Sequence, residues 1–147
     1  MVENPTEAKT KTILSLPHTA VSLENGIQVY LVQYPLKGLV AYQLPVRVGS
    51  RNEVEKGKTG FAHFFEHLMF RGTKNRTGKE FGDLYNKLGC ENNAWTDLDF
   101  TNYHGVVASQ YLEQILEAEA DRFQNLSFEE KLLRDEAGAV LGEYNKD

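Results

Sequence analysis

Several residue types and sequence features that mark specialised protein classes are rare or missing in this chain. Cysteine occurs once, at Cys90, so an intrachain disulfide is excluded, and we expect this thiol to be a small buried side chain. No apolar run is long enough to cross a bilayer, so we expect no membrane span. The start of the chain, Met1 to Thr12, is polar and mixed in charge, unlike a signal peptide. The compartment therefore stays open, including an extracytoplasmic one if a signal has been removed.

Blocks of basic residues are missing as well. The net charge of −5 and a pI near 5.4 disfavour a nucleic-acid or anionic-membrane surface, so we expect no nucleic-acid partner. Hydrophobic residues make up 41% of the 147 residues, and glycine and proline are at ordinary levels, which predicts one soluble globular domain with its own core. The acidic residues of the last third are expected to be solvated: Glu113, Glu117, Glu119, Asp121, Glu129 and Glu130.

The first half of the chain shows a change from strand patterning to helix patterning. Residues 1–11 are expected to be a flexible lead-in. Apolar and polar residues alternate from Ala20 to Val48, which predicts strands that break at Asn25-Gly26 and near residues 35–38. Asn-Gly between alternating segments is a strong hairpin signal. A polar loop follows, and a largely buried helix is expected to begin near Gly60.

The middle of the chain predicts a capped helix and two further strands. The segment Thr77-Gly78-Lys79-Glu80 fits a capping box that opens a helix through Leu88, where Gly89 ends it. Residues 91–108 are rich in aromatic and β-branched residues and are expected to be extended, with a bend at residues 97–99.

The last part of the chain predicts two helices. One is expected from about Ser109 to Asn125, and Ser127-Phe128-Glu129-Glu130 fits a capping box that starts a second one, running to the chain end. The order is therefore strands, two helices, strands and two helices. This order predicts an α+β fold, a two-layer sandwich with helices packed on one face of a mostly antiparallel sheet.

The segment His63-Phe64-Phe65-Glu66-His67 carries the clearest chemical signal. It has the pattern H-x-x-E-H of the inverted zinc hydrolases. Residues i and i+4 of a helix lie on the same face, so both imidazoles can reach one metal ion. Glu66 lies beside that face, where its carboxylate could take a proton from a metal-bound water. Only four histidines occur in the chain, and two of them belong to this motif.

A catalytic zinc needs a third protein ligand, and the final helix offers candidates. Glu136 and Glu143 lie two helical turns apart on one face, among small or apolar neighbours. Spacing alone leaves open whether they are ligands or ordinary solvated glutamates.

Three segments of the chain together resemble the catalytic amino-terminal part of the pitrilysin, or insulinase-like, metallopeptidases, which include the mitochondrial processing peptidases. The resemblance extends over most of residues 15 to 145 and includes the predicted hairpin at Leu23-Glu24-Asn25-Gly26. The segments that carry it are Gly60 through Thr73, Asn93-Ala94-Trp95-Thr96 with Asp99, Thr101 and Tyr103, and Glu136 through Glu143.

The resemblance implies a role for each matching residue. His63, His67 and Glu143 would bind Zn²⁺, and Glu66 would be the general base of a metal-activated water that hydrolyses a peptide bond. Glu136 would accept a hydrogen bond from a ligating imidazole and fix its orientation.

The resemblance also implies how substrate and partner chains bind. Asn93 and Ala94 would lie on an edge strand whose backbone pairs with an extended peptide or unfolded polypeptide. Members of the family pair two similar halves, each longer than this chain. Residues 12–147 would then be part of an amino-terminal catalytic domain, and a second peptidase half or partner subunit is expected.

Two alternatives to an active peptidase stay open. The chain could be a zinc-binding module or fragment that is inactive without a partner or second half, because water exclusion and substrate positioning would be incomplete. Lyases that cleave S-ribosylhomocysteine also carry H-x-x-E-H, but they use two cysteines where this chain has only Cys90.

A few other polar and aromatic residues receive ordinary structural interpretations. Trp95 is expected to pack in the core first and to line a pocket second. His18 and His104 lie outside the motif and lack ligand spacing. A small basic cluster after the metal helix is expected to be a solvated loop: Arg71, Lys74, Arg76 and Lys79.

Overall fold

The structure is a computed structural model that describes residues 16–35, 37–57, 59–127 and 129–144. The predicted lead-in, residues 1–11, lies outside the described residues. The chain divides into two units, Met1–Lys37 and Gly38–Asp147, and the predicted site lies entirely in the second.

The described part of the first unit is a β-hairpin. Strands β1 (His18–Ser22) and β2 (Gln28–Val32) pair antiparallel. They are joined at the predicted Asn25-Gly26 turn, where Gly26 has a φ of 88°, a value that favours glycine. The side chain of Asn25 accepts a hydrogen bond of 3.1 Å from the backbone N–H of Ile27 and so stabilises the turn. The hairpin predicted from Asn25-Gly26 is confirmed.

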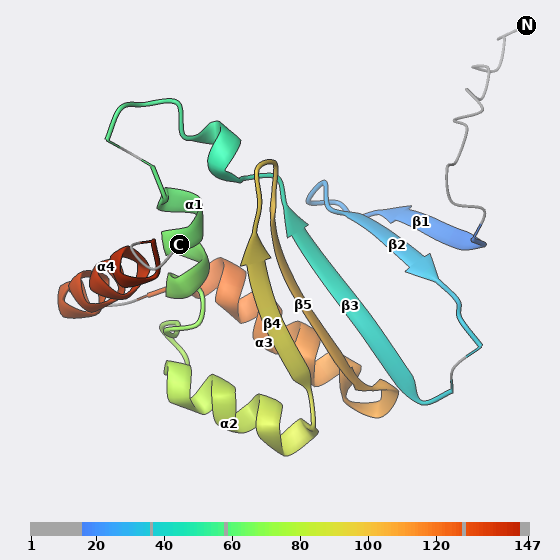
Figure 1. Cartoon of the computed structure of the whole chain (residues 1–147). Helices are drawn as coiled ribbons and strands as arrows, with labels where there is room; N and C mark the ends of the chain where they lie inside the picture. The colour runs from blue at the N-terminus through green and yellow to red at the C-terminus, as the bar shows by residue number, and fades with distance from the viewer. Residues whose placement is uncertain (1–15, 36, 58, 128, 145–147) are drawn as a thin grey trace, which may run out of the picture. The chain divides into compact units, whose positions relative to one another are not determined.

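The second unit contains a three-stranded antiparallel sheet (Figure 1). Its strands are β3 (Leu39–Val46), β4 (Glu91–Thr96) and β5 (Thr101–Ala108), in the order β3-β5-β4. The bend at residues 97–99 joins β4 to β5, as the sequence predicts. Because β5 is central, β4 is left at an edge of the sheet.

Four α-helices complete the second unit: α1 (Phe61–Leu68), α2 (Gly78–Leu88), α3 (Leu112–Asn125) and α4 (Glu130–Tyr144). Short 3₁₀ helices, η1 (Ser50–Asn52) and η2 (Ser109–Tyr111), precede α1 and α3. No helix in the described part of the chain is long and apolar enough to span a membrane.

The predicted capping box of α2 is confirmed. Thr77 Oγ1 accepts from the backbone N–H of Glu80 at 3.3 Å, and the Glu80 carboxylate accepts from the backbone N–H of Thr77 at 2.7 Å. Gly89 ends the helix with a φ of 62°. Helix α4 begins where the second capping box predicts a helix, but that box includes Phe128, which lies outside the described residues, as do residues 145–147.

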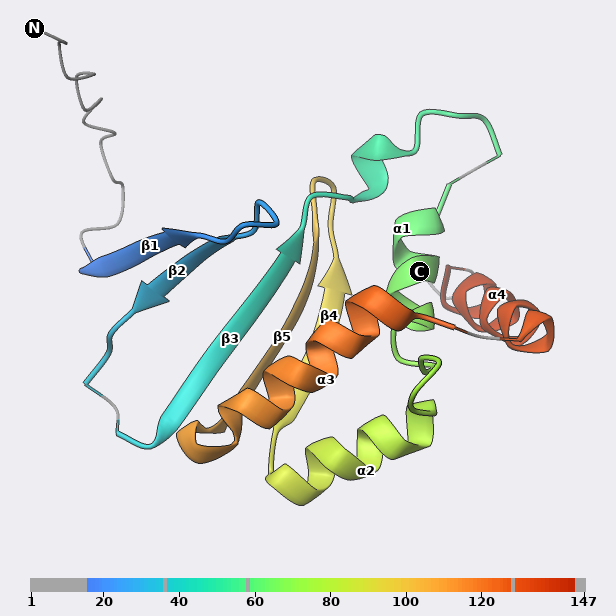
Figure 2. The same ribbon diagram turned by 180° about the vertical axis from the view of Figure 1, so that it is seen from behind.

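Helices α2 and α3 pack on one face of the sheet, and α3 crosses that face when the molecule is seen from behind (Figure 2). The predicted α+β fold is confirmed. The core between these layers contains the following buried side chains: Tyr42, Phe81, Tyr85, Leu88, Cys90, Val107, Ile115 and Ala118. Cys90 is therefore a small buried side chain, as predicted for the only cysteine of the sequence.

Two acidic residues of α3 are buried, and for these the prediction of a solvated acidic face is wrong. Glu119 is 3% exposed and Asp121 is 9% exposed. Glu119 accepts hydrogen bonds from the hydroxyls of Tyr42 at 3.0 Å and Tyr85 at 2.7 Å, and it lies 3.5 Å from the guanidinium of Arg122. A carboxylate can be buried when it finds such partners. Arg122 is on the same helix, but the two tyrosines come from β3 and α2, which only the fold brings to α3.

Candidate metal centre

Helix α1 carries the two histidines of the motif. Its first turn is held by Glu53, whose carboxylate accepts hydrogen bonds from the backbone N–H groups of Gly60 at 2.6 Å and Ala62 at 2.8 Å. A carboxylate at a helix N-terminus is stabilising because it pairs with N–H groups that lack partners inside the helix. This contact is not predicted from the sequence, because Glu53 lies in a charged loop with no cap spacing to the helix.

The imidazoles of His63 and His67 meet the carboxylate of Glu143 from α4. The two Nε2 atoms lie 3.1 Å apart, and each lies 3.6 Å from Glu143 Oε2. All three atoms lie within 4.8 Å of one another. Among the described residues, these three side chains form the cluster of histidine and acidic groups that could hold a metal ion. The fold therefore brings the candidate third ligand to the histidine pair across the contact between α1 and α4.

These separations fit a zinc ion. Bonds of about 2.0–2.1 Å from zinc to a histidine nitrogen or a carboxylate oxygen place neighbouring corners of a tetrahedron about 3.3 Å apart. The three separations found between the candidate ligand atoms, 3.1, 3.6 and 3.6 Å, lie on either side of that value. Two nitrogens and one oxygen would leave a fourth corner for water or substrate, as catalytic sites require.

Glu136, one of the two acidic candidates on α4, lies behind the histidine pair. Its Oε2 lies 3.4 Å from Nδ1 of His67, on the side of the ring opposite the candidate ligand atom, and the residue is 4% exposed. Its Oε1 lies 2.5 Å from the guanidinium of Arg71. Glu136 and Glu143 thus contact opposite nitrogens of one imidazole.

Glu66 faces a cavity beside the histidines and is 8% exposed. Its Oε2 accepts a hydrogen bond of 2.5 Å from the hydroxyl of Thr96, at the end of β4. Thr96 Oγ1 lies 3.2 Å from Thr101 Oγ1, which in turn donates to the carbonyl oxygen of Val48 at 2.9 Å. The cavity, of about 470 Å³, is lined by Ser50, His63, Glu66, Ala94, Trp95, Thr96, Asp97 and Leu98. No role for Thr96 is predicted from the sequence, because its contact with Glu66 arises only from the packing of α1 against β4.

Asn93 and Ala94 lie on β4, opposite His104 and Tyr103 of β5. Within the described residues β5 is the sheet neighbour of β4, so the other side of β4 is an open edge. The side chain of Asn93 accepts a hydrogen bond of 2.9 Å from the backbone N–H of Ala94. The expected edge strand is thus present, with one of its N–H groups paired locally.

Trp95 lies outside the core, where it was expected first, and lines a cavity, where it was expected second. It is 41% exposed, packs edge-to-face on Phe100 with ring centroids 5.0 Å apart, and lines the cavity next to Glu66. Strand alternation explains the difference, since Trp95 is on the face opposite its neighbours Ala94 and Thr96.

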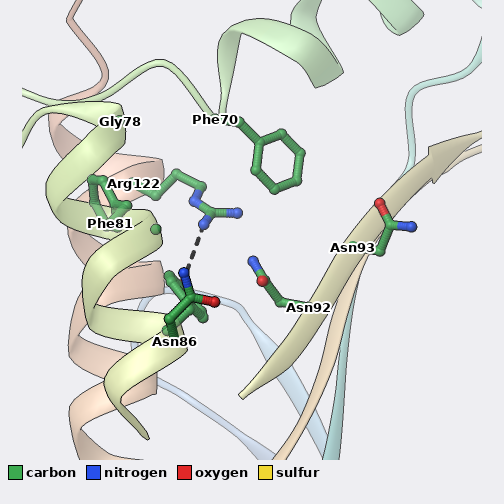
Figure 3. Close-up of a pocket in the computed structure, with 9 residues that line it drawn as sticks. Phe70, Gly78, Phe81, Asn86, Asn92, Asn93 and Arg122 are labelled. Atoms are coloured by element: carbon green, nitrogen blue, oxygen red, sulfur yellow. Dashed lines mark hydrogen bonds between the residues drawn. The ribbon is translucent and has the colours of Figure 1, made fainter. Parts of the chain in front are cut away.

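A second cavity, of about 410 Å³, lies between α2 and β4 (Figure 3). Arg122 extends into it from α3, with its guanidinium 4.7 Å from the ring centre of Phe70 and hydrogen-bonded through Nη2 to Tyr85 at 3.2 Å. The side chain of Asn92 reaches from β4 toward Arg122. The lining of this cavity combines aromatic side chains with polar ones, and Asn93 of β4 is among the polar ones.

The comparisons with known proteins agree on one family. The family model described as "Insulinase (Peptidase family M16)" matches residues 28–146. The chain is 38% identical over 114 residues to "Zinc protease PqqE" of Helicobacter pylori, a match that covers 77% of this chain and 26% of that protein. It is 34% identical over 142 residues to "Mitochondrial-processing peptidase subunit beta" of Homo sapiens, covering 96% of this chain and 29% of the relative.

A solved structure supports the same fold. It is titled "The crystal structure of a protease from Helicobacter pylori", is 36% identical, and matches with a TM-score of 0.82. The match covers 87% of this chain and 31% of that chain. The chain therefore spans less than a third of the length of each of these three proteins.

Proposed function

Because the chain belongs to the insulinase family, peptidase family M16, we propose that it provides the metal site of a zinc metalloendopeptidase acting on peptides or unfolded polypeptides. The matched region is a zinc metallopeptidase-type domain. The convergence of His63, His67 and Glu143 from two helices carries the proposal.

His63 Nε2, His67 Nε2 and Glu143 Oε2 are the proposed ligand atoms. Zinc, when bound there, supplies a Lewis acid that activates water and polarises a carbonyl group. Glu136 would keep the imidazole of His67 oriented by accepting a hydrogen bond from its Nδ1–H, and the place of Oε2, 3.4 Å from Nδ1, supports this role.

Glu66 is the proposed general base. It removes a proton from the attacking water and later delivers that proton to the leaving amine, so no covalent intermediate is required. Its burial and its place in the lining of the same cavity as His63 support this role, because a base must lie within reach of the water that it activates. The hydrogen bond from Thr96 fixes one carboxylate oxygen and leaves the other for the proton transfer.

Strand β4 is the proposed substrate-binding element. An extended peptide would add as a strand to its open edge, with main-chain hydrogen bonds at Asn93 and Ala94 supplying affinity. The bond between the Asn93 side chain and the Ala94 N–H would exchange for a bond to substrate. The two cavities, both lined in part by residues of β4, would then accept side chains of the peptide.

A complete enzyme is proposed to need more than this chain. The family relatives are more than three times as long as the matched region, and they include a subunit named for a mitochondrial processing peptidase and "Cytochrome b-c1 complex subunit 1, mitochondrial" of Rattus norvegicus. We propose a second peptidase half or a partner subunit that closes over the substrate. The alternative is a zinc-binding module that is inactive without that partner.

The position of Cys90, the only cysteine in the sequence, argues against the lyase alternative. Cys90 is 7% exposed and packs in the core with Tyr42 and Tyr85, and burial raises the pKa of its thiol. A lyase of that type would need this sulfur at the metal. Oε2 of Glu143, and not this sulfur, lies next to the Nε2 atoms of both histidines.

The proposed function is tested by measuring zinc content and peptide cleavage on the full-length protein, first alone and then with the proposed second half supplied in trans. Glu66→Gln is expected to retain zinc and lose hydrolysis, whereas Glu143→Gln is expected to weaken zinc binding. Zinc without cleavage, restored by the added half, would support the split-enzyme form of the proposal. A wild-type protein that binds no zinc would overturn it.

A further inference from the structure

Arg71 lies just beyond the C-terminal end of α1 and contacts α4. Its Nη2 lies 2.5 Å from Oε1 of Glu136, which makes this a short, charge-assisted hydrogen bond. The Arg71 side chain is 45% exposed, so it reaches from the surface to a carboxylate that is almost fully buried. The sequence predicts a solvated loop residue at Arg71, and its contact with the buried Glu136 makes that description incomplete.

The two oxygens of Glu136 have different neighbours. Arg71 holds Oε1, while Oε2 lies 3.4 Å from Nδ1 of His67 and has no hydrogen bond within the described part of the chain. A carboxylate is planar, so fixing one oxygen limits where the other can lie. A contact at Arg71 therefore determines which atom faces the His67 ring.

We propose that Arg71 is a positioning residue for the metal centre, acting on His67 through Glu136; this inference rests on the proposed zinc site. With Oε2 of Glu136 held as an acceptor at Nδ1, the His67 proton belongs on Nδ1 and the lone pair belongs on Nε2. That lone pair then faces the candidate ligand atoms of His63 and Glu143.

Charge balance supports the same conclusion. Three carboxylates lie near the histidine pair: those of Glu136 and Glu143 contact His67, and Glu66 lines the same cavity as His63. A divalent ion would neutralise two of these charges, and Arg71 supplies the third positive charge. Without Arg71, Glu136 would be a buried carboxylate whose nearest partner is a neutral imidazole, an arrangement that is costly unless the carboxylate moves.

A purely structural alternative gives different results in an experiment. Arg71 could serve only to attach α4 to the end of α1, in which case its loss would lower stability without a specific effect on the metal. Arg134 offers a matched control, because it forms an exposed ion pair of 2.6 Å with Glu130 on the same helix and does not touch the site.

The test compares Arg71→Met, Arg71→Lys and Arg134→Met in the full-length protein. Zinc affinity is measured by competition with a chelating dye, and the protonated nitrogen of His67 is identified by ¹H–¹⁵N NMR of the zinc-free protein. Arg71→Met is expected to weaken zinc binding about tenfold, at the low end of the effect of outer-shell residues, and to reduce the Nδ1–H form of His67. Arg71→Lys is expected to recover part of both, since lysine keeps the charge but not the planar geometry.

A double-mutant cycle with Glu136→Ala identifies the route of the effect. If Arg71 acts through Glu136, Arg71→Met will cause no further loss of zinc affinity in the Glu136→Ala background. Equal losses in both backgrounds, or a lower melting temperature with unchanged zinc affinity, would overturn the inference. Should Arg71→Met not fold, wild-type zinc affinity and an unchanged His67 tautomer in Arg71→Lys would do the same. Failure of the proposed function is distinguishable, since the wild-type protein would then bind no zinc through His63 and His67.

Discussion

The hydroxyl of Thr96 donates a hydrogen bond of 2.5 Å to the carboxylate of Glu66. This contact joins the end of the edge strand β4 to the last turn of the histidine helix α1. If β4 binds substrate and Glu66 acts as the base, a single side chain couples the position of the peptide to the position of the base.

Replacing Thr96 by Val keeps the shape of the side chain and removes the donor. We expect peptide hydrolysis to fall by roughly tenfold with zinc content unchanged, because a hydrogen bond to a charged group contributes about 1.5–3 kcal/mol and the base would lose its fixed orientation. Thr96→Ser, which retains the hydroxyl, is the matched control. Wild-type turnover in Thr96→Val, measured as kcat, would contradict the importance of this contact.

Glu119 is predicted to be a major source of stability. Glu119→Gln removes the charge that faces Arg122 and leaves that guanidinium buried without an anionic partner, which is expected to cost about 3 kcal/mol. The measurement is the free energy of unfolding in urea. Glu117→Gln, on the exposed face of the same helix, should change it by less than about 0.5 kcal/mol. Equal values for the two variants would show that the buried pair contributes no net stability.

The stability contributed by Asp121 should depend on pH. Burial acts to raise the pKa of this carboxyl, but hydrogen bonds from Thr73, Asn75 and Asn125 outweigh it and hold the pKa below its usual range. A group whose pKa is lowered by folding stabilises the protein above its unfolded pKa, about 3.9, and loses that contribution as the pH falls toward the folded value. Asp121→Asn should therefore be destabilising by about 1–3 kcal/mol at pH 7 and by clearly less near pH 3.

Unfolding free energies at the two pH values check this prediction. Asp83→Asn, an exposed aspartate on α2, is the control and should change little at either pH. A destabilisation by Asp121→Asn that is the same at pH 7 and pH 3 would mean that the hydrogen bonds do not favour the charged form.

Gly49 is predicted to be intolerant of any side chain. A Cβ there would lie 2.3 Å from the backbone carbonyl oxygen of Asp97 and 2.6 Å from that of Leu98, and both of these residues line the cavity next to Glu66. Gly49→Ala should destabilise the protein by about 2 kcal/mol, because backbone atoms must move to admit the methyl group.

Gly82 provides the opposite case within the same chain. A Cβ at this position in the interior of α2 would meet nothing within 4 Å. Gly82→Ala should stabilise the protein by about 0.5–1 kcal/mol, since alanine favours the helix. Thermal melting of the two alanine variants tests both values, and a Gly49→Ala protein as stable as wild type would refute the steric argument.

Local sequence signals predicted the elements of this fold well. The hairpin at Asn25-Gly26 and the capped helix from Thr77 to Gly89 are set by interactions between residues a few positions apart, so a reader of the sequence can find them. The α+β class follows from their order. The predicted solvation of Glu119 and Asp121 was wrong because Tyr85 and Thr73, which donate hydrogen bonds to them, lie outside α3, and no local pattern predicts such contacts.

The sequence by itself determined the spacing of His63, Glu66 and His67 along one helix and the presence of two glutamates on another, because helical geometry fixes which residues share a face. Only the tertiary structure decided what these groups contact. The packing of α1 against α4 and β4 brings Glu143 to Nε2 of His67, Glu136 to Nδ1, and Thr96 to Glu66. Residues distant in the chain meet through side-chain packing of whole elements, and the spacing of residues within one element does not encode that contact.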